Sequence, residues 1–95
     1  MLESKFKTTL IREIRERLPG AVVIHMNPPP QGIPDILILY GRHWGALEGK
    51  QATTSPHRPN QDYWVEQLNN MSFASFITPD TKKEVLNAME QSFMA

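Results

Sequence analysis

The segment GIPDILILYGRHWGALEGK, residues 32–50, constrains the fold more than any other part of the chain. Residues 36–40 (ILILY) are apolar on both faces of an extended chain, which is typical of a central strand in a sheet. Gly41-Arg42 follows as a turn, with glycine in the first position that a type II′ hairpin turn requires. Residues 44–50 then form the returning strand. The segment therefore predicts an antiparallel hairpin whose first strand is buried.

The length of the turn determines which residues face each other across this hairpin. A turn of two residues, or a loop of four, places Leu37 opposite Ala46 and Asp35 opposite Glu48. Directly opposed side chains share one face of the sheet, with Cβ atoms about 4.5–5.5 Å apart. Lys50 follows Glu48 by two residues and therefore belongs to the same face. We expect Asp35, Glu48 and Lys50 to converge at one end of an otherwise apolar face.

Two carboxylates at this separation repel each other, and three arrangements can relieve the repulsion. At about 4 Å and an effective dielectric constant near 20, the cost is on the order of 4 kcal/mol. One carboxyl group can stay protonated, or Lys50 can neutralise part of the charge in a structural salt bridge at a strand end. The third arrangement is a Mg²⁺ or Mn²⁺ ion between the carboxylates. Such an ion would polarise a phosphodiester and activate a water, which Lys50 could orient.

Gly49 lies between these charged residues, and its side-chain direction is the opposite face of the strand. A strand interior normally carries a bulky residue at such a position. Glycine there indicates the close approach of a helix or of another subunit. The carbonyl group of Gly49 still points sideways and could serve as a metal ligand.

The rest of the chain predicts helices on both sides of a small mixed sheet, in the order α-β-β-β-α-β-α. Apolar residues at helical or alternating spacing mark each element, and proline and glycine mark the ends. The expected elements are a helix at 3–18, strands at 21–26, 36–40 and 44–50, a helix at 60–71, a strand at 73–77 and a helix that Thr78-Pro79 begins. We therefore expect a single α/β domain that spans residues 1–95.

The composition excludes some kinds of site and of location. The chain has no cysteine, which rules out disulfides and thiolate metal sites and suits a reducing compartment. It has no apolar run near the roughly 18 residues that cross a membrane, and no apolar segment of the signal-peptide kind at its start. We expect a cytoplasmic protein with no membrane partner.

The distribution of charge favours a basic face, although the formal net charge is zero. Residues 1–58 hold eight Lys or Arg against five Asp or Glu, whereas residues 59–95 hold two against five. A metal ion on the acidic residues of the first part would make that part more positive still. Uneven charge of this kind is compatible with a basic face that binds a DNA backbone, and equally with a solvated surface on which the charges are unevenly spread.

A family resemblance arises from the same residues. Gly32-Ile33-Pro34-Asp35, a spacer of twelve residues and then Glu48-Gly49-Lys50 resemble the signature of PD-(D/E)XK nucleases. The GIPD form and the short hairpin after it resemble the virus-type replication-repair nuclease (VRR-NUC) branch of that superfamily. The resemblance covers nearly the whole chain, including Glu3-Ser4 at the first helix and, beyond the lysine, Ser55-Pro56, Gln61, Trp64 and Leu68. It implies a restriction-endonuclease-like α/β fold.

The resemblance also implies roles for individual residues. Asp35 and Glu48 would hold Mg²⁺ or Mn²⁺ together with the carbonyl of Gly49, and Glu3 would reach the metal from the first helix. Lys50 would be the catalytic lysine. Candidate contacts to DNA are Lys5, Lys7, Arg12, His57, Arg58 and Gln61, with Arg15 and Arg17 on the same helix as the first three.

The chain departs from the family pattern at two places. The family usually has an aliphatic residue where Gly49 stands, and a glycine where Asn70-Met71-Ser72 precede the last strand. Neither departure removes a reacting group. We therefore expect the catalytic chemistry to be retained.

The expected function is a metal-dependent, structure-specific DNA endonuclease. Minimal stand-alone members of the family, typical of phages, resemble dimeric enzymes that cleave branched DNA in repair and recombination. A homodimer that resolves four-way (Holliday) junctions is therefore the expected form. The alternatives are a monomeric nickase or flap nuclease, and a DNA-binding protein that keeps a nuclease fold without cutting.

Overall fold

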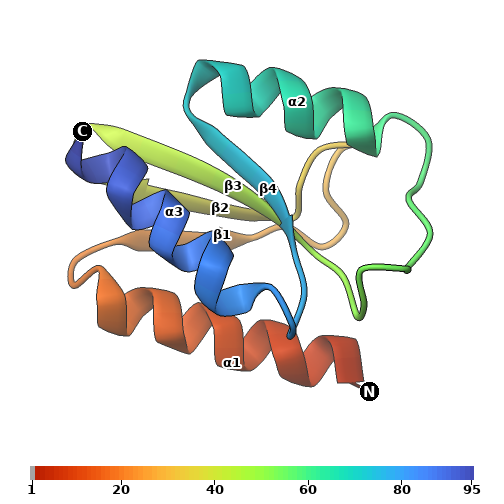
Figure 1. Cartoon of the computed structure of the whole chain (residues 1–95), viewed down its shortest axis with the longest axis horizontal. Helices are drawn as coiled ribbons and strands as arrows, with labels where there is room; N and C mark the ends of the chain where they lie inside the picture. The colour runs from red at the N-terminus through yellow and green to blue at the C-terminus, as the bar shows by residue number, and fades with distance from the viewer. Residues whose placement is uncertain (1) are drawn as a thin grey trace.

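A computed structural model describes residues 2–95, with the side chains of residues 5–95. The chain forms a four-stranded mixed sheet with three helices, and the predicted order α-β-β-β-α-β-α is confirmed (Figure 1). The elements are α1 (Leu2–Arg17), β1 (Val22–His25), β2 (Ile36–Tyr40), β3 (His43–Gly49), α2 (Gln61–Met71), β4 (Phe73–Ile77) and α3 (Lys82–Met94).

The strands follow one another across the sheet in chain order, β1-β2-β3-β4. The pairs β1–β2 and β2–β3 are antiparallel, whereas β3 and β4 are parallel. In the central hairpin Leu37 pairs with Ala46 and Tyr40 pairs with His43, so the predicted register is confirmed. The turn is the pair Gly41-Arg42, and Gly41 has the positive φ of 61° that its position requires.

The main core lies between the sheet and the two helices α1 and α3, which cover the same face (Figure 1). It contains apolar residues from one side of each helix and from alternate positions of the strands. The buried members are Leu10, Ile14, Leu18, Ile36, Ile38, Leu47, Ile77, Leu86, Met89 and Phe93. This core makes the central hairpin a rigid support for the residues at its ends.

Helix α2 packs on the opposite face of the sheet, over β3 and β4 (Figure 1). It leaves apolar side chains of the other two strands partly uncovered, namely Val22, Ile24 and Leu39. Val22 and Leu39 are paired across β1 and β2, so these residues share one surface. None of the described helices has the length and apolar character needed to cross a membrane.

The end of the hairpin where β2 begins and β3 ends is flanked by two loops, residues 26–35 before β2 and residues 50–60 after β3. The loop before β2 contains three successive prolines and a cis peptide bond between Asn27 and Pro28. Its base is held by the N–H of Met26, which donates to the carbonyl oxygen of Asp35 at 2.8 Å. Later in this loop, Gly32 packs so closely on α2 that a Cβ there would lie 2.8 Å from Cδ1 of Trp64. The loop is thereby fixed against the start of α2.

The last helix begins later than the sequence predicts. Its first residue is Lys82, with Thr81 as the N-cap, so the predicted cap at Thr78 is wrong. Two hydrogen bonds link Thr78 and Thr81. The N–H of Thr81 donates to the hydroxyl oxygen of Thr78 at 3.1 Å, and the N–H of Thr78 donates to the hydroxyl oxygen of Thr81 at 3.0 Å. These bonds form a separate turn between β4 and α3.

Candidate active site

A groove of about 960 Å³ lies where the hairpin meets the proline loop, the N-terminal part of α1 and the start of α2. The register of the hairpin places Asp35, just before β2, opposite the end of β3. The groove is lined by all of the predicted catalytic residues and by several candidate DNA contacts. Among its lining residues are Asp35, Glu48, Gly49, Lys50, Gln61, Lys7 and Arg58.

The two carboxylates of the groove are buried, with Asp35 4% exposed and Glu48 7% exposed. Burial raises the pKa of Glu48, and the neighbouring charge of Asp35 raises it further, while Lys50 and Lys7 act in the opposite direction. Asp35 is anchored by the N–H of Gly49, which donates to Oδ1 across 3.4 Å. The predicted pairing of two acidic side chains at the strand end is thus present.

Glu48 carries an unsatisfied oxygen. Its Oε1 is buried and has no hydrogen-bond partner among the residues that the structure describes. A buried acceptor without a donor is costly unless a further ligand satisfies it. Asp35 and Glu48 together offer hard oxygen ligands, so their arrangement fits a Mg²⁺ or Mn²⁺ ion.

These two residues supply only part of a metal-binding set. Within the described residues, no cluster of three or more His, Cys, Asp or Glu side chains forms. The side chain of Glu3, the predicted third acidic ligand, lies outside the described residues. The role of the Gly49 carbonyl stays a prediction.

Lys50 does not pair with the carboxylates, although the hairpin places it on their face. Its ammonium group donates to Oε1 of Gln61 at 2.9 Å and to the carbonyl oxygen of Pro56 at 3.1 Å. Both acceptors are neutral, and the charge of Lys50 also acts on Glu48, where it opposes the rise in the pKa of that carboxyl group. The long side chain extends beyond the strand end toward α2, which the alternation of strand residues alone does not reveal.

Gln61 is the residue that ties the groove to α2. It is 5% exposed and is the first residue of that helix. Besides Lys50, its Oε1 accepts a hydrogen bond from the N–H of Arg58 at 2.8 Å. The sequence indicated Gln61 through its family-like position, and the structure adds a specific contact to Lys50.

The cation that pairs with Asp35 is Lys7, which reaches the groove from α1 and forms an ion pair with Oδ2. The stem of Lys7 crosses the backbone of Gly49, where an added Cβ would lie 3.0 Å from Cε of the lysine. The predicted close approach at Gly49 is therefore confirmed, and the approaching element is helix α1. This ion pair was not predicted from the sequence, in which Lys7 was a candidate contact to DNA only.

His25 is a second residue that the sequence analysis missed. Its Nε2 lies 3.5 Å from Oδ2 of Asp35, on the same oxygen that Lys7 contacts. The pairing of β1 with β2 places His25 opposite Ile36, so strand alternation alone puts His25 on the other face from Asp35. Scattered histidines without metal-ligand spacing gave no reason to select it.

The two candidate DNA contacts in the loop after β3, His57 and Arg58, differ in how many contacts they make within the protein. His57 forms a hydrogen bond of 2.7 Å between its Nδ1 and Oδ1 of Asp62, and its ring stacks on Phe76 with centroids 4.0 Å apart. These contacts hold the loop that contains Pro56, whose carbonyl oxygen accepts a hydrogen bond from Lys50. Arg58 is exposed and lines the groove. Of the two, Arg58 is better placed to meet a phosphate.

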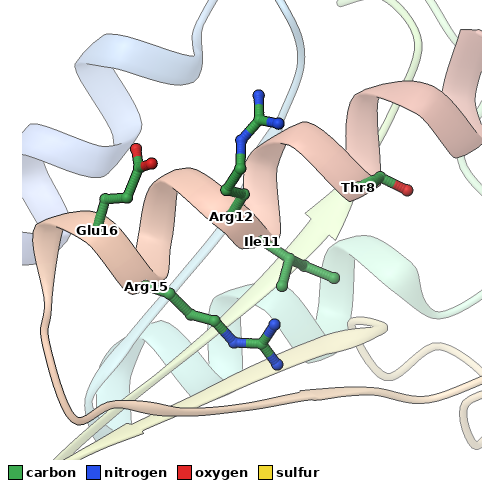
Figure 2. Close-up of a pocket in the computed structure, with 5 residues that line it drawn as sticks. All are labelled: Thr8, Ile11, Arg12, Arg15 and Glu16. Atoms are coloured by element: carbon green, nitrogen blue, oxygen red, sulfur yellow. The ribbon is translucent and has the colours of Figure 1, made fainter.

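The basic residues of α1 lie on different sides of the helix. Lys5, Arg12 and Arg15 are exposed, and a shallow hollow of about 440 Å³ lies beside the last two on the outer surface. Figure 2 shows the side chains of Arg12 and Arg15 extending in different directions, so they do not converge on one ligand. Arg17 instead pairs with Glu90 at 3.2 Å and joins α1 to α3.

Comparisons with models of known families, with curated proteins and with solved structures find no match for this chain. The comparisons therefore identify no family. The function of the chain has to be inferred from the residues of the groove and their geometry.

Proposed function

We propose that this chain is a metal-dependent DNA endonuclease with a restriction-endonuclease-like fold, related to the VRR-NUC branch of PD-(D/E)XK nucleases. One observation carries the proposal above all others. The confirmed hairpin register brings buried Asp35 beside buried Glu48, whose Oε1 has no described partner, in a groove that also holds Lys50. A buried acidic group with a raised pKa in a groove, as Glu48 is, is typical of a functional site.

The proposed chemistry is hydrolysis of a phosphodiester bond. Asp35 and Glu48 would hold Mg²⁺ or Mn²⁺, with the Gly49 carbonyl and Glu3 as further ligands. When bound, the ion supplies charge that polarises the phosphodiester and lowers the pKa of a water. Lys50, held by Gln61 and Pro56, would orient that water or offset the charge that develops on the phosphate.

The proposed substrate is branched DNA, and the preferred form is a homodimer that cuts a four-way junction. A dimer would supply two sites for two strands and a wider basic surface than one copy. Exposed apolar residues on β1 and β2, described above, are the kind of surface that subunit contacts bury. Lys5, Lys7, Arg12, His57 and Arg58 remain the proposed contacts to the DNA backbone.

The decisive experiment is a cleavage assay on four end-labelled substrates: a four-way junction, a flap, a linear duplex and single-stranded DNA. Each is incubated with Mg²⁺ or Mn²⁺, and the wild type is compared with Lys50→Ala and with Lys83→Ala. Lys83 is an exposed lysine of α3 outside the groove, so its loss should not affect cutting. We expect paired, symmetric cuts in the junction that only Lys50→Ala abolishes.

Other results would select an alternative. Equal cutting of all four substrates would leave a nuclease but remove the junction preference. Cutting of the flap or nicking by a monomer would favour the monomeric enzyme. If the chain binds the junction tightly but does not cut it with Mg²⁺ or Mn²⁺, the proposed nuclease activity is contradicted. That result would favour a DNA-binding protein that keeps the fold.

A further inference from the structure

Lys7 and Asp35 form an ion pair that is largely shielded from water. Their side chains are 15% and 6% exposed, and the lysine contacts Oδ2 of the carboxylate. Attraction between opposite charges is stronger in such a place than on an exposed surface. Lys7 therefore supplies positive charge at one oxygen of the carboxylate that, together with Glu48, would hold a metal ion.

The path of Lys7 depends on the absence of a side chain at position 49. A Cβ on Gly49 would lie 3.0 Å from Cε, 3.4 Å from Cγ and 3.7 Å from Cδ of Lys7. An alanine there would require the lysine stem to shift by a few tenths of an ångström, and a bulkier residue would require a larger shift. Gly49 and Lys7 thus form a matched pair in which the glycine makes room for the lysine.

We infer that Lys7 is an internal competitor of the metal ion, bound to Asp35 in the metal-free site and displaced toward the DNA phosphate when a divalent cation binds. A lysine suits this exchange, because its ammonium is a point charge on a flexible stem. Its stem lies along the wall of the groove, so the displaced ammonium stays close to an incoming phosphate. The exchange lowers metal affinity in the absence of DNA and adds a phosphate contact in its presence.

This inference rests on the proposed function, since it assumes that Asp35 and Glu48 bind a metal. Its first test needs no DNA cleavage. Isothermal titration calorimetry with Mn²⁺ alone compares the wild type, Lys7→Met and Lys83→Met, after their folds have been checked by circular dichroism. Methionine keeps an unbranched stem against Gly49 and removes the charge.

We expect Lys7→Met to bind Mn²⁺ about tenfold more tightly than the wild type, because one charge-assisted contact no longer competes for Asp35. Lys83→Met should bind as the wild type does. Equal affinities of wild type and Lys7→Met would overturn the competition and leave the proposed function intact. If no variant binds Mn²⁺ and the wild type cuts no DNA, the proposed function fails and the inference fails with it.

A second pair of variants tests the same idea by changing Gly49, with the lysine present and with it replaced. Gly49→Ala should push Lys7 from its path and raise Mn²⁺ affinity by a smaller factor in the same direction. In the Lys7→Met background the same alanine should have no effect, because the two changes act through one contact. An equal effect of Gly49→Ala in both backgrounds would contradict a role for Lys7.

The second half of the inference concerns the phosphate. In a Lys50→Ala background, which prevents cutting, junction binding with Mn²⁺ is measured as a function of salt. We expect Lys7→Met to reduce the slope of log affinity against log salt by about one, the loss of one phosphate contact. An unchanged slope would show that the displaced lysine does not reach the DNA.

Discussion

Oε1 of Gln61 lies 2.9 Å from the ammonium nitrogen of Lys50, at the point where α2 begins beside the end of β3. The same oxygen accepts the N–H of Arg58 at 2.8 Å, so one buried amide links strand, loop and helix. Both described acceptors of the Lys50 ammonium, this amide and the carbonyl oxygen of Pro56, are neutral groups. In the proposed enzyme, this contact would position Lys50 for the reaction.

Replacing Gln61 tests that positioning. Gln61→Ala removes the acceptor of Lys50, and we expect cleavage of a four-way junction to slow by roughly tenfold or more, since misplaced catalytic groups are costly. Gln61→Glu keeps an acceptor oxygen and should restore part of the rate. Single-turnover cleavage rates across pH measure both, with Gln91→Ala on α3 as the control. Equal rates for Gln61→Ala and the wild type would contradict the role.

Metal binding should stabilise the folded chain, because the paired carboxylates form only when the hairpin is folded. We expect millimolar Mn²⁺ to raise the melting temperature, and Asp35→Asn to abolish the rise. At a metal concentration of about 100 times Kd, the gain is roughly 2.7 kcal/mol.

Asp80 provides a matched control for this measurement, since Pro79-Asp80 repeats the Pro-Asp pair of the site but lies in the exposed turn before α3. Asp80→Asn should respond to Mn²⁺ as the wild type does. A rise that persists in Asp35→Asn would place the metal elsewhere.

The raised pKa of Glu48 predicts how stability varies with pH in the metal-free protein. Burial makes the folded state bind the proton of Glu48 more tightly than the unfolded state does. The contribution of Glu48 is therefore fully present below the unfolded pKa and is lost as the pH rises through the folded pKa. Glu48→Gln, which mimics the protonated form, should be more stable than the wild type at about pH 8 and similar to it near pH 4.

Thermal melts in a chelating buffer across this range measure the effect. Glu84→Gln, an exposed glutamate of α3, is the control and should follow the wild type. In Mn²⁺ the wild type should be more stable than Glu48→Gln, because only the wild type retains the second carboxylate ligand. If the wild type has a higher melting temperature than Glu48→Gln at every pH without metal, burial does not raise the pKa of Glu48 as we expect.

Gly32 should be essential for the position of the proline loop. Its φ is 82°, and an added Cβ would lie 2.8 Å from Cδ1 of Trp64 and 2.9 Å from Cβ of Asn60. Gly32→Ala therefore combines backbone strain, about 1–2 kcal/mol, with overpacking, about 1–3 kcal/mol. Urea denaturation should show the sum as a lower free energy of unfolding.

Gly20→Ala separates the two contributions. Gly20 has a similar φ of 90°, but nothing lies within 4 Å of its missing Cβ, so this variant should show only the backbone strain. We expect Gly32→Ala to be clearly less stable than Gly20→Ala. Equal losses would mean that the loop relaxes away from α2.

Local sequence features were sufficient for the order of elements and for the hairpin. The apolar run of β2 and the turn at Gly41-Arg42 determine a register in which Asp35 falls opposite Glu48. Both signals act over a few residues, because strand side chains alternate with a period of two and a short turn leaves little freedom. The glycine at position 49 even indicated that another element approaches there.

Tertiary structure decided which partners the charged residues have. Lys7 and Asp35 are 28 positions apart, and Lys50 and Gln61 are 11 apart, so no local period connects either pair. The docking of α1 and α2 on the two faces of the sheet brings each pair together, and the stem of a lysine can reach in several directions once its Cβ is placed. Backbone periodicity therefore placed the carboxylates, whereas helix packing chose the cation for Asp35 and the acceptor for Lys50.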